Sequence, residues 1–399
     1  MFCLARTTAV FGIVTMALAP LLAVCASYPK LPVKGYLAGE RISTTVDSGL
    51  AKHYLEHSLS WATANSELDQ RIVDVEQRFK ERPLDWLTLR ELSAETTPDF
   101  ATLFFIKQSL SDSRNAKLQK AYWQEVNRIN PAAGRTNRTV IAQSELRKYK
   151  LIFIPGFHYL SDPSSGADFY NQRQLFRQLG IRVELAATQE DGTIEENAAI
   201  IAAVVRSESK SNTPLIMISA SKGGPETALA LGKMLNPSET TWVKAWLSVG
   251  GLIEGTFLAD HVTGWPKSLL ARIALRYSGI DPRSLPGMTT AASRERMKGI
   301  TLPLHIFVLQ FVGTPLSGDI ANDVRSRYIK LRKYGPNDGL TLLADELIPR
   351  GVTIIEPGLD HFYRDPEIDL KSLALANMVA NELADKSAVG KRQALPSFR

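Results

Sequence analysis

The spacing of apolar residues divides the chain into two parts. Between residues 46 and 130, apolar positions recur three or four apart, which is typical of helices that bury one face. The segments with this spacing are "LAKHYLEHSLSWA", "LDQRIVDVEQRF", "DFATLFFIKQSL" and "LQKAYWQEVNRI". Residues 28–44 contain two prolines and two glycines and are expected to form an extended lead-in. We therefore predict a mostly helical N-terminal region over residues 27–147.

From residue 148 to residue 399 the pattern changes to short apolar runs separated by helix-like segments. The predicted strands are "KLIFIPGF", "IRVELAAT", "PLIMISA", "VKAWLSVGG", "LPLHIFVLQFVG" and "GVTIIEPG". Strands that alternate with helices predict an α/β fold with a largely parallel sheet and helices on both faces. Such sheets place their functional sites beyond the carboxyl ends of the strands. Residues that follow the apolar runs are therefore the candidates for chemistry.

Ser221 directly follows the run "PLIMISA". The segment from Ser219 to Gly223 is a variant of the G-x-S-x-G turn, which holds a nucleophilic serine on a sharp strand-to-helix corner. Small residues are needed around that serine because the strand and helix nearly touch; Gly223 and Gly224 meet this need, and Ser219 is small. The alternative is that Ser221 only caps the helix. The order of strand, turn and alanine-rich helix favours the nucleophile.

A nucleophilic serine needs a base, and His361 is the best candidate among six histidines. It follows the last predicted strand, and in this architecture the acid and then the histidine come after the serine. His158 also follows a strand and is expected to line the pocket. The remaining histidines are interpreted as a helical packing pair or a zinc pair (His53, His57), part of a lid segment (His261) and a buried strand residue (His305).

The sequence indicates the acidic partner of His361 less clearly than it indicates the serine and the histidine. The candidates between Ser221 and His361 are Asp319, Asp323, Asp338 and Asp345. Simple geometry favours Asp319, because it is the closest to the end of its strand. Asp338 lies in "YGPNDGL", a turn sequence that would hold a carboxylate in a loop. Asp360, next to the histidine, is interpreted as a turn-forming residue.

The segments "FIPGF", "SASKGG", "GPNDGL" and "PGLDHFY" together resemble α/β-hydrolases of the lipase and esterase type over about residues 148–385. Bacterial lipases of that superfamily carry their aspartate in an Asn-Asp-Gly-Leu turn a little over twenty residues before the histidine. The resemblance implies Ser221 as nucleophile, Asp338 rather than Asp319 as acid, and His361 as base. By the same layout the backbone N–H groups of Phe157 and Lys222 form the oxyanion hole, with Gly156 allowing the chain to turn.

These residues predict a carboxylic ester hydrolase that works through an acyl-enzyme, with no cofactor and no metal. Its substrate would be a small-molecule or lipid ester. Residues 255–300, which include Phe257, Leu258 and Trp265, are predicted to form an apolar lid or cap. An acyltransferase or thioesterase using the same triad remains an alternative. So does a non-catalytic exported binding protein that retains the fold.

The amino-acid composition limits the possible partners and the cellular location of the protein. The net charge is +6, but basic residues are scattered, which argues against nucleic-acid binding. Residues 1–26 have one arginine followed by an uncharged stretch, and they predict a signal for export to the periplasm or medium. A lipid-modified Cys25, or retention of the stretch as an anchor, would place the protein at a membrane surface. The only cysteines, Cys3 and Cys25, lie in this segment, so a cleaved chain has no thiol chemistry or disulfide.

Overall fold

The computed structural model describes residues 28–59, 66–130, 145–264 and 282–394. The predicted signal, residues 1–26, lies outside these ranges, as does the segment 265–281 of the predicted lid. In the ranges described, none of the helices combines the length and the apolar character that a membrane span requires.

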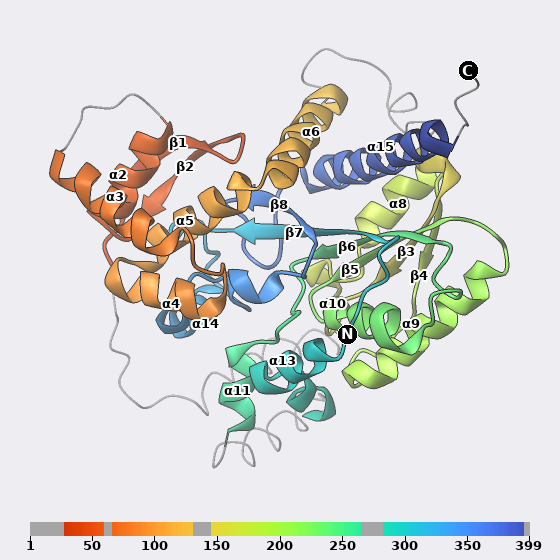
Figure 1. Ribbon diagram of the computed structural model, residues 1–399. Helices are drawn as coiled ribbons and strands as arrows, with labels where there is room; N and C mark the ends of the chain where they lie inside the picture. Colours follow the sequence, from red (N-terminus) through yellow and green to blue (C-terminus); the bar gives the residue numbers. More distant parts are fainter. Residues whose placement is uncertain (1–27, 60–65, 131–144, 265–281, 395–399) are drawn as a thin grey trace, which may run out of the picture.

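A parallel sheet forms the centre of the molecule (Figure 1). Within the described residues it has six strands in the order β4-β3-β5-β6-β7-β8, and every neighbouring pair is parallel. The strands are β3 (Lys150–Ile154), β4 (Arg182–Leu185), β5 (Leu215–Ala220), β6 (Val243–Val249), β7 (Phe307–Thr314) and β8 (Val352–Pro357). All residues of β7 and β8 are buried, which explains why the sequence shows continuous apolar runs instead of alternation. The predicted parallel α/β architecture is confirmed.

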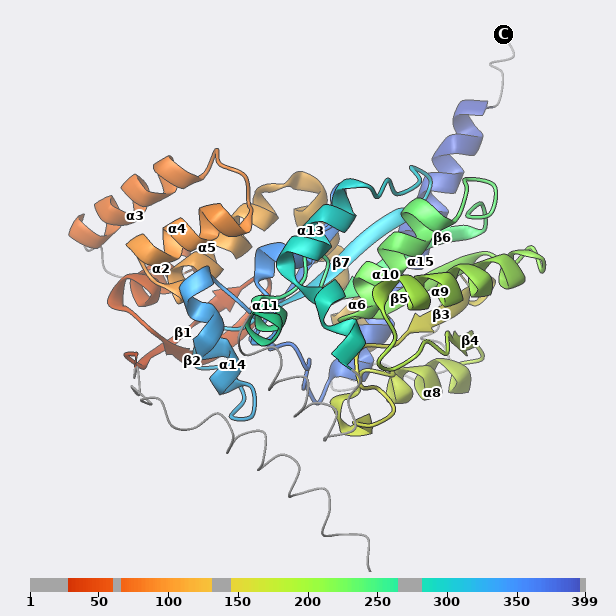
Figure 2. The same ribbon diagram turned by 90° about the horizontal axis from the view of Figure 1, so that it is seen from below.

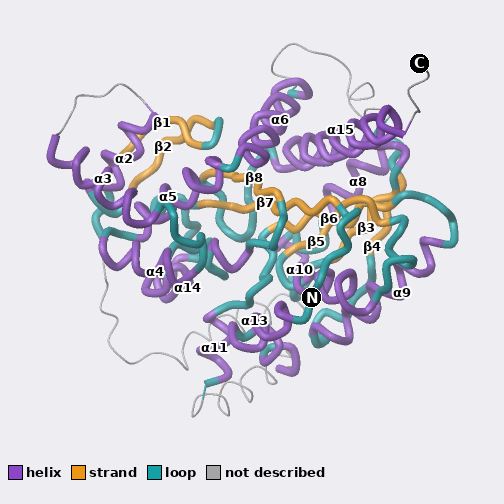
Figure 3. Tube along the Cα trace, viewed as in Figure 1, coloured by secondary structure: helices purple, strands orange, loops and turns teal. Residues whose placement is uncertain are grey.

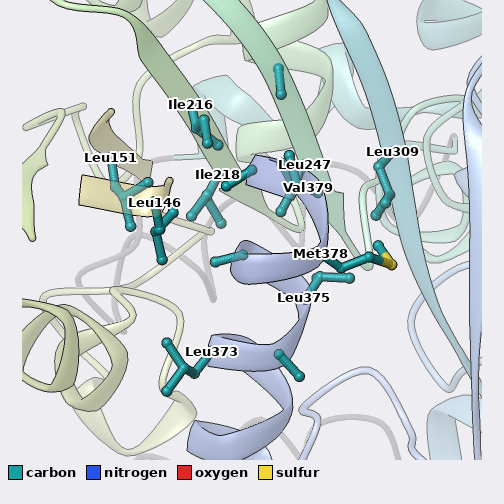
Figure 4. Packing of buried hydrophobic residues seen from close by; sticks show 14 of the residues in the cluster. Leu146, Leu151, Ile216, Ile218, Leu247, Leu309, Leu373, Leu375, Met378 and Val379 are labelled. Carbon is teal, nitrogen blue, oxygen red and sulfur yellow. The ribbon is translucent and has the colours of Figure 1, made fainter. Parts of the chain in front are cut away.

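Helices cover both faces of this sheet (Figures 1 and 2). One face carries α6 (Ser113–Ile129), α8 (Tyr170–Gln178) and α15 (Ile368–Ala394). Figure 4 shows part of its core, where Leu375 and Val379 of α15 pack toward Ile218, Leu247 and the strands that carry them. The other face carries α9 (Ile194–Ser209) and α10 (Gly223–Leu229), which a π turn, η4 (Ala230–Met234), extends. The sheet is therefore buried on both sides, and its strand ends are left to form a site.

The predicted extended lead-in is a β-hairpin. β1 (Leu31–Leu37) and β2 (Glu40–Val46) pair in antiparallel fashion around a two-residue turn. Both turn residues have positive φ angles, +51° at Ala38 and +98° at Gly39, as tight hairpin turns require. The sequence prediction missed this pairing because alanine at the first turn position is not a typical hairpin signal.

Helices follow the hairpin, as the apolar spacing predicts (Figure 3). They are α2 (Gly49–Leu59), α3 (Ser66–Phe79), α4 (Trp86–Glu95) and α5 (Pro98–Ser111), before α6. Their core is continuous with the sheet, because Phe100 and Phe104 of α5 share one apolar cluster with Val312 of β7 and Ile355 of β8. The N-terminal region thus packs directly against the strands at the β8 edge.

The remaining described elements are short. The helices are α11 (Phe257–Thr263), α13 (Thr290–Lys298) and α14 (Arg325–Leu331). The 3-10 turns are η2 (Leu146–Lys148), η3 (Pro163–Ser165), η5 (Pro282–Ser284), η6 (Pro286–Met288), η7 (Arg332–Tyr334) and η8 (Leu343–Glu346).

One buried carboxyl joins the N-terminal region to the sheet. Asp99 is fully buried at the start of α5. Its oxygens accept hydrogen bonds from the amide of Asp47 (2.7 Å) and from the amide and hydroxyl of Ser317 (2.9 and 2.6 Å). The Asp47 carboxylate in turn accepts from the Arg332 guanidinium (2.9 Å). Burial, and then the neighbouring Asp47 charge, raise the pKa of Asp99 above its ordinary value of 3.8.

The raised pKa predicts how stability depends on pH. The stabilisation linked to the protonated Asp99 carboxyl is complete below the unfolded-state pKa and is lost as pH rises through the higher folded-state pKa. We expect Asp99→Ala to lower the free energy of unfolding by about 2–4 kcal/mol at pH 5, because buried donors lose their acceptor. The advantage of the unmodified protein over Asp99→Asn should shrink between pH 5 and pH 8. Urea unfolding at several pH values measures this; an advantage that stays constant or grows contradicts the prediction.

Candidate active site

Ser221 lies in a strained turn between β5 and α10. Its φ angle is +50°, a left-handed conformation that costs a residue with a side chain about 1 kcal/mol or more. Three backbone hydrogen bonds hold it there. The Ser221 amide donates to the carbonyl of Val249 (3.0 Å), and its carbonyl accepts from the amides of Gly224 (2.9 Å) and Leu252 (3.1 Å). The turn therefore presents the hydroxyl beyond the end of the sheet, as the motif predicts.

The three predicted glycines lie where the chain leaves little space for a side chain, and least at Gly223. A Cβ at Gly223 would lie 2.8 Å from the carbonyl oxygen of Pro155, at the end of β3. One at Gly224 would lie 3.0 Å from the backbone of the loop after β6. One at Gly156 would lie 3.3 Å from the Cβ of Ser221. The strand-to-helix corner therefore requires glycine at Gly223 and packs tightly at the other two positions; none of the three has a positive φ angle.

Ser219, which stands where the motif has its first glycine, has a structural role of its own. Its side chain is fully buried, and its hydroxyl accepts a hydrogen bond from the indole N–H of Trp246 on the neighbouring strand β6 (2.9 Å). A buried indole donor requires such an acceptor. Glycine would leave the donor unpaired, so the departure from the motif is coupled to the tryptophan.

The structure brings Ser221, His361 and Asp338 together from three separate loops. His361 Nε2 lies 3.0 Å from Ser221 Oγ, and His361 Nδ1 lies 2.5 Å from Asp338 Oδ2. The amide of His361 also donates to the backbone carbonyl of Asp338 (3.0 Å). Asp338 is 1% exposed and His361 is 9% exposed, so the carboxylate acts on the imidazole with little screening by water.

The Asn-Asp-Gly turn orients the Asp338 carboxylate. Its Oδ1 accepts from the amides of Leu340 (2.8 Å) and Thr341 (2.7 Å), which leaves Oδ2 for the histidine. Asn337 accepts from the amide of Gly339 (3.0 Å), whose φ angle is +96°. The hydrogen bonds of the turn thus orient the Asp338 carboxylate so that Oδ2 contacts His361.

The other candidate acids have different partners. Asp319 accepts from the amide of Leu316 (2.9 Å), and burial raises its pKa to about 6. The Asp319 carboxylate makes no contact with His361, so the expectation from strand geometry alone is wrong. The remaining acids pair with arginines (Asp323 with Arg364, Asp345 with Arg294) or accept turn amides (Asp360 from Phe362 and Ala321).

The two residues predicted to form the oxyanion hole lie close to Ser221, since Phe157 lines the same cavity and Lys222 is the next residue in the chain. Within the described residues, the amides of Phe157 and Lys222 have no acceptor. Phe157 follows Gly156, whose amide donates to the carbonyl of Ala167 (2.9 Å) and so folds the loop after β3 back on itself. These are the donors expected for an oxyanion hole.

The Lys222 side chain points away from these groups. It is 2% exposed, and its ammonium donates to the carboxylate of Glu226 (2.5 Å), which also accepts from the Asn197 amide (2.8 Å). Burial raises the pKa of Glu226 to about 7, although Lys222 opposes this shift. Asn197 further bonds the backbone N–H and C=O of Gln189. The lysine thus ties the elbow to α9 and the loop before it, a role that the sequence analysis did not find.

A cavity of about 990 Å³ contains Ser221 and His361. One part lies between the sheet and helices α8 and α15 and is apolar, lined by Phe153, Phe176, Ile218, Leu247, Phe311 and Leu375. Phe157, His158 and residues 161–170 and 361–365 also line the cavity. No described residue of the predicted lid, 255–300, lines it, and Phe257 instead stacks on Tyr334 with ring centres 4.0 Å apart. Trp265 and most other apolar residues of that lid prediction lie outside the described residues.

His158 lines the cavity, as expected, and forms the one group in the described residues with the spacing of a metal site. Its Nε2 lies 3.6 Å from Asp191 Oδ1, its Nδ1 lies 3.7 Å from Glu190 Oε1, and its Nδ1 also contacts the Ser161 hydroxyl (2.8 Å). Glu190 also accepts from the amides of Leu160 and Ser161 (both 2.6 Å). The group therefore already holds two loops together, and it could take a cation. The sequence analysis predicted no metal and did not connect these residues, which lie about thirty positions apart.

The remaining histidines lie elsewhere. His53 contacts Asp69 of α3 (2.7 Å), and the His57 side chain is outside the described set. His261 bonds its own helix at the carbonyl of Phe257 (3.1 Å). His305 is exposed and precedes β7, which begins at Phe307, so its prediction as a buried strand residue is wrong, although its Nε2 does contact the carbonyl of Thr240 (3.0 Å).

The parallel sheet, the strained serine turn after β5 and the donor loop after β3 define the α/β-hydrolase fold. No family model and no curated protein matches the sequence. Among solved structures, the metagenomic carboxyl esterase MGS0156 is similar, with 24% identity, 60% of this chain and 76% of that chain covered, and a TM-score of 0.49. Bacillus licheniformis lipase BlEst2 in its mature form has 18% identity, 59% and 91% coverage, and a TM-score of 0.45. Staphylococcus hyicus lipase has 13% identity, 62% and 97% coverage, and a TM-score of 0.44.

The pairing of Ser219 with Trp246 yields a test of the elbow. We expect Ser219→Gly to lower the free energy of unfolding by about 1–3 kcal/mol, because the buried indole N–H loses its acceptor. Trp246→Phe serves as the second arm of a double-mutant cycle, since it removes the donor while retaining an aromatic ring. In chemical denaturation, the free energy of unfolding lost in the double variant should be smaller than the sum of the losses in the two single variants. Strict additivity would show that the hydrogen bond does not explain the serine.

Proposed function

We propose that this protein is a serine hydrolase that cleaves carboxylic esters through an acyl-enzyme. The observation that carries the proposal is the hydrogen-bonded array from Ser221 through His361 to Asp338, with its reactive end open to a cavity. A serine hydroxyl is a weak nucleophile until an adjacent base accepts its proton. The 3.0 Å contact between Ser221 Oγ and His361 Nε2 is within the reach that such a transfer needs.

Each residue has a defined task in this reaction. Ser221 Oγ attacks the carbonyl carbon of the ester while His361 Nε2 takes its proton. The Asp338 carboxylate, buried against Nδ1, stabilises the imidazolium that forms and holds the ring in the correct tautomer. His361 then gives the proton to the departing alcohol, and water repeats the sequence to release the acid.

The amides of Phe157 and Lys222 would stabilise the oxyanion of each tetrahedral intermediate. Such donors are effective because they are already oriented before the reaction begins. The hydrogen bond from Gly156 and the buried side chain of Lys222 restrain the two loops that carry them. Removal of one donor in comparable sites lowers kcat by about 10²–10³-fold.

A serine variant and two matched aspartate variants test the proposed catalytic residues. We expect Ser221→Ala to reduce hydrolysis of p-nitrophenyl acyl esters by about 10⁴-fold or more, and Asp338→Asn by about 10³–10⁴-fold. Asp319→Asn is the control, because that carboxyl does not contact His361 and its variant should retain wild-type turnover. Circular dichroism checks that each variant is folded. Wild-type turnover in a folded Ser221→Ala variant would reject the proposal.

A fluorophosphonate probe separates catalysis from simple binding. The probe should label Ser221 in the wild-type protein and fail to label the Ser221→Ala variant, because only an activated serine reacts. Product analysis with an added acceptor alcohol distinguishes hydrolysis from acyl transfer. A wild-type protein that the probe does not label would favour a non-catalytic binding protein.

A further inference from the structure

The cavity wall beside the catalytic histidine carries an arginine without an acidic partner. Arg327, on α14, is half-buried and lines the same cavity as Ser221 and His361. Its guanidinium has five N–H donors, but the only hydrogen bond it makes within the described residues is to the backbone carbonyl of Asp323 (3.2 Å). Among those residues, no carboxylate lies within ion-pair distance of it.

The neighbouring charges are already paired. Arg364 takes both oxygens of the Asp323 carboxylate, at 2.9 and 2.7 Å, and lies over the Phe362 ring, which Arg327 also approaches. Of the acids that line the cavity, Asp168 pairs with Arg173 (2.6 Å) and Asp365 with Lys371 (2.5 Å). A third, Asp162, accepts from the Ser164 hydroxyl (2.5 Å) and lies in the field of Arg364.

Arg327 therefore brings a guanidinium with spare N–H donors and no direct ion pair to the cavity wall, although the carboxylates of Asp323, Asp360 and Asp338 act on it from a distance. Burial lowers the pKa of Arg327; the Asp323 carboxylate, and more weakly those of Asp360 and Asp338, oppose this shift, while the charge of Arg364 adds to it. A half-buried guanidinium has lost part of its hydration, and a bound anion can replace the missing hydrogen bonds to water. Its planar donors suit carboxylate and phosphate oxygens. The free donors are consistent with a site for such an anion.

The residues that line the cavity indicate which part of a substrate lies near Arg327. The apolar part of the cavity, toward Leu375 and Ile218, suits an acyl chain. The guanidinium groups of Arg327 and Arg364 lie 5.7 and 4.6 Å from the centre of the Phe362 ring. Phe362 directly follows His361, the residue that protonates the departing alcohol in the proposed reaction. We propose that the substrates are acyl esters whose alcohol part carries a phosphate or carboxylate that binds Arg327. This inference rests on the proposed hydrolysis at Ser221.

Three esters with the same decanoyl chain test the proposal. Their alcohols are glycerol, which is neutral, glycerol 3-phosphate, and glycolate, which carries a carboxylate. We expect kcat/KM for at least one anionic ester to exceed that for the neutral ester by about 10-fold or more, as a charge-assisted contact provides. The two anionic esters show whether phosphate or carboxylate is preferred. In Arg327→Gln the ratio of anionic to neutral kcat/KM should fall by a similar factor.

Lys330→Gln is the matched control, because it removes one positive charge from the same helix at an exposed position that does not line the cavity. The kcat/KM ratio should be unchanged in this variant. A loss equal to that of Arg327→Gln would indicate a general charge effect and overturn the proposal. Equal kcat/KM for all three esters in the wild-type protein would also overturn it, while leaving ester hydrolysis established.

A binding measurement makes the test independent of turnover. Calorimetry on Ser221→Ala compares decyl phosphate, decanoyl glycolate and neutral decyl glucoside, with and without the additional Arg327→Gln change. Anion binding that depends on Arg327 supports the site even if no ester is hydrolysed, in which case only the proposed function fails. Equal affinity for the anionic and neutral ligands overturns the inference.

Discussion

The close approach of the β3 end to the start of α10 is the constraint on which the site depends. Gly223 allows α10 to begin against the carbonyl of Pro155, two residues after Ser221 in its left-handed conformation. The same approach places the loop of Phe157 beside the serine, so one packing contact positions both the hydroxyl and an N–H donor. A side chain at Gly223 would separate the two loops, which is why the strain at the serine and the lack of space at the glycine occur together.

Buried charges around this contact are arranged in pairs. Lys222 pairs with Glu226 at the elbow and Asp338 pairs with His361, whereas Asp99, whose raised pKa favours the neutral carboxyl, is hydrogen-bonded by Ser317 in the loop after β7. A buried charge without a partner is costly, so such pairs are the expected form. Arg327 departs from this arrangement at the cavity wall, and the departure has a physical explanation if an anionic group of the substrate provides the missing partner.

The site was predictable from sequence to different degrees. Ser221 directly follows β5, and His361 lies four residues beyond the end of β8, so a local pattern located both. Asp338 lies more than twenty residues beyond its strand, and strand geometry alone pointed to Asp319 instead; only the resemblance to lipases favoured Asp338. The hairpin before α2 was missed because its turn begins with alanine, and His305 was assigned to a strand that starts two residues later.

By itself, the order of apolar runs and polar turns determined a parallel α/β sheet and the positions of the elbow and the histidine, because backbone periodicity and turn chemistry are local properties. The tertiary structure alone decided which acid reaches His361, why Ser219 replaces glycine, and where the Lys222 ammonium lies. It also showed that Arg327 lines the cavity with no ion-pair partner among the described residues. These features depend on contacts between residues far apart in the chain, whose distances no local pattern specifies.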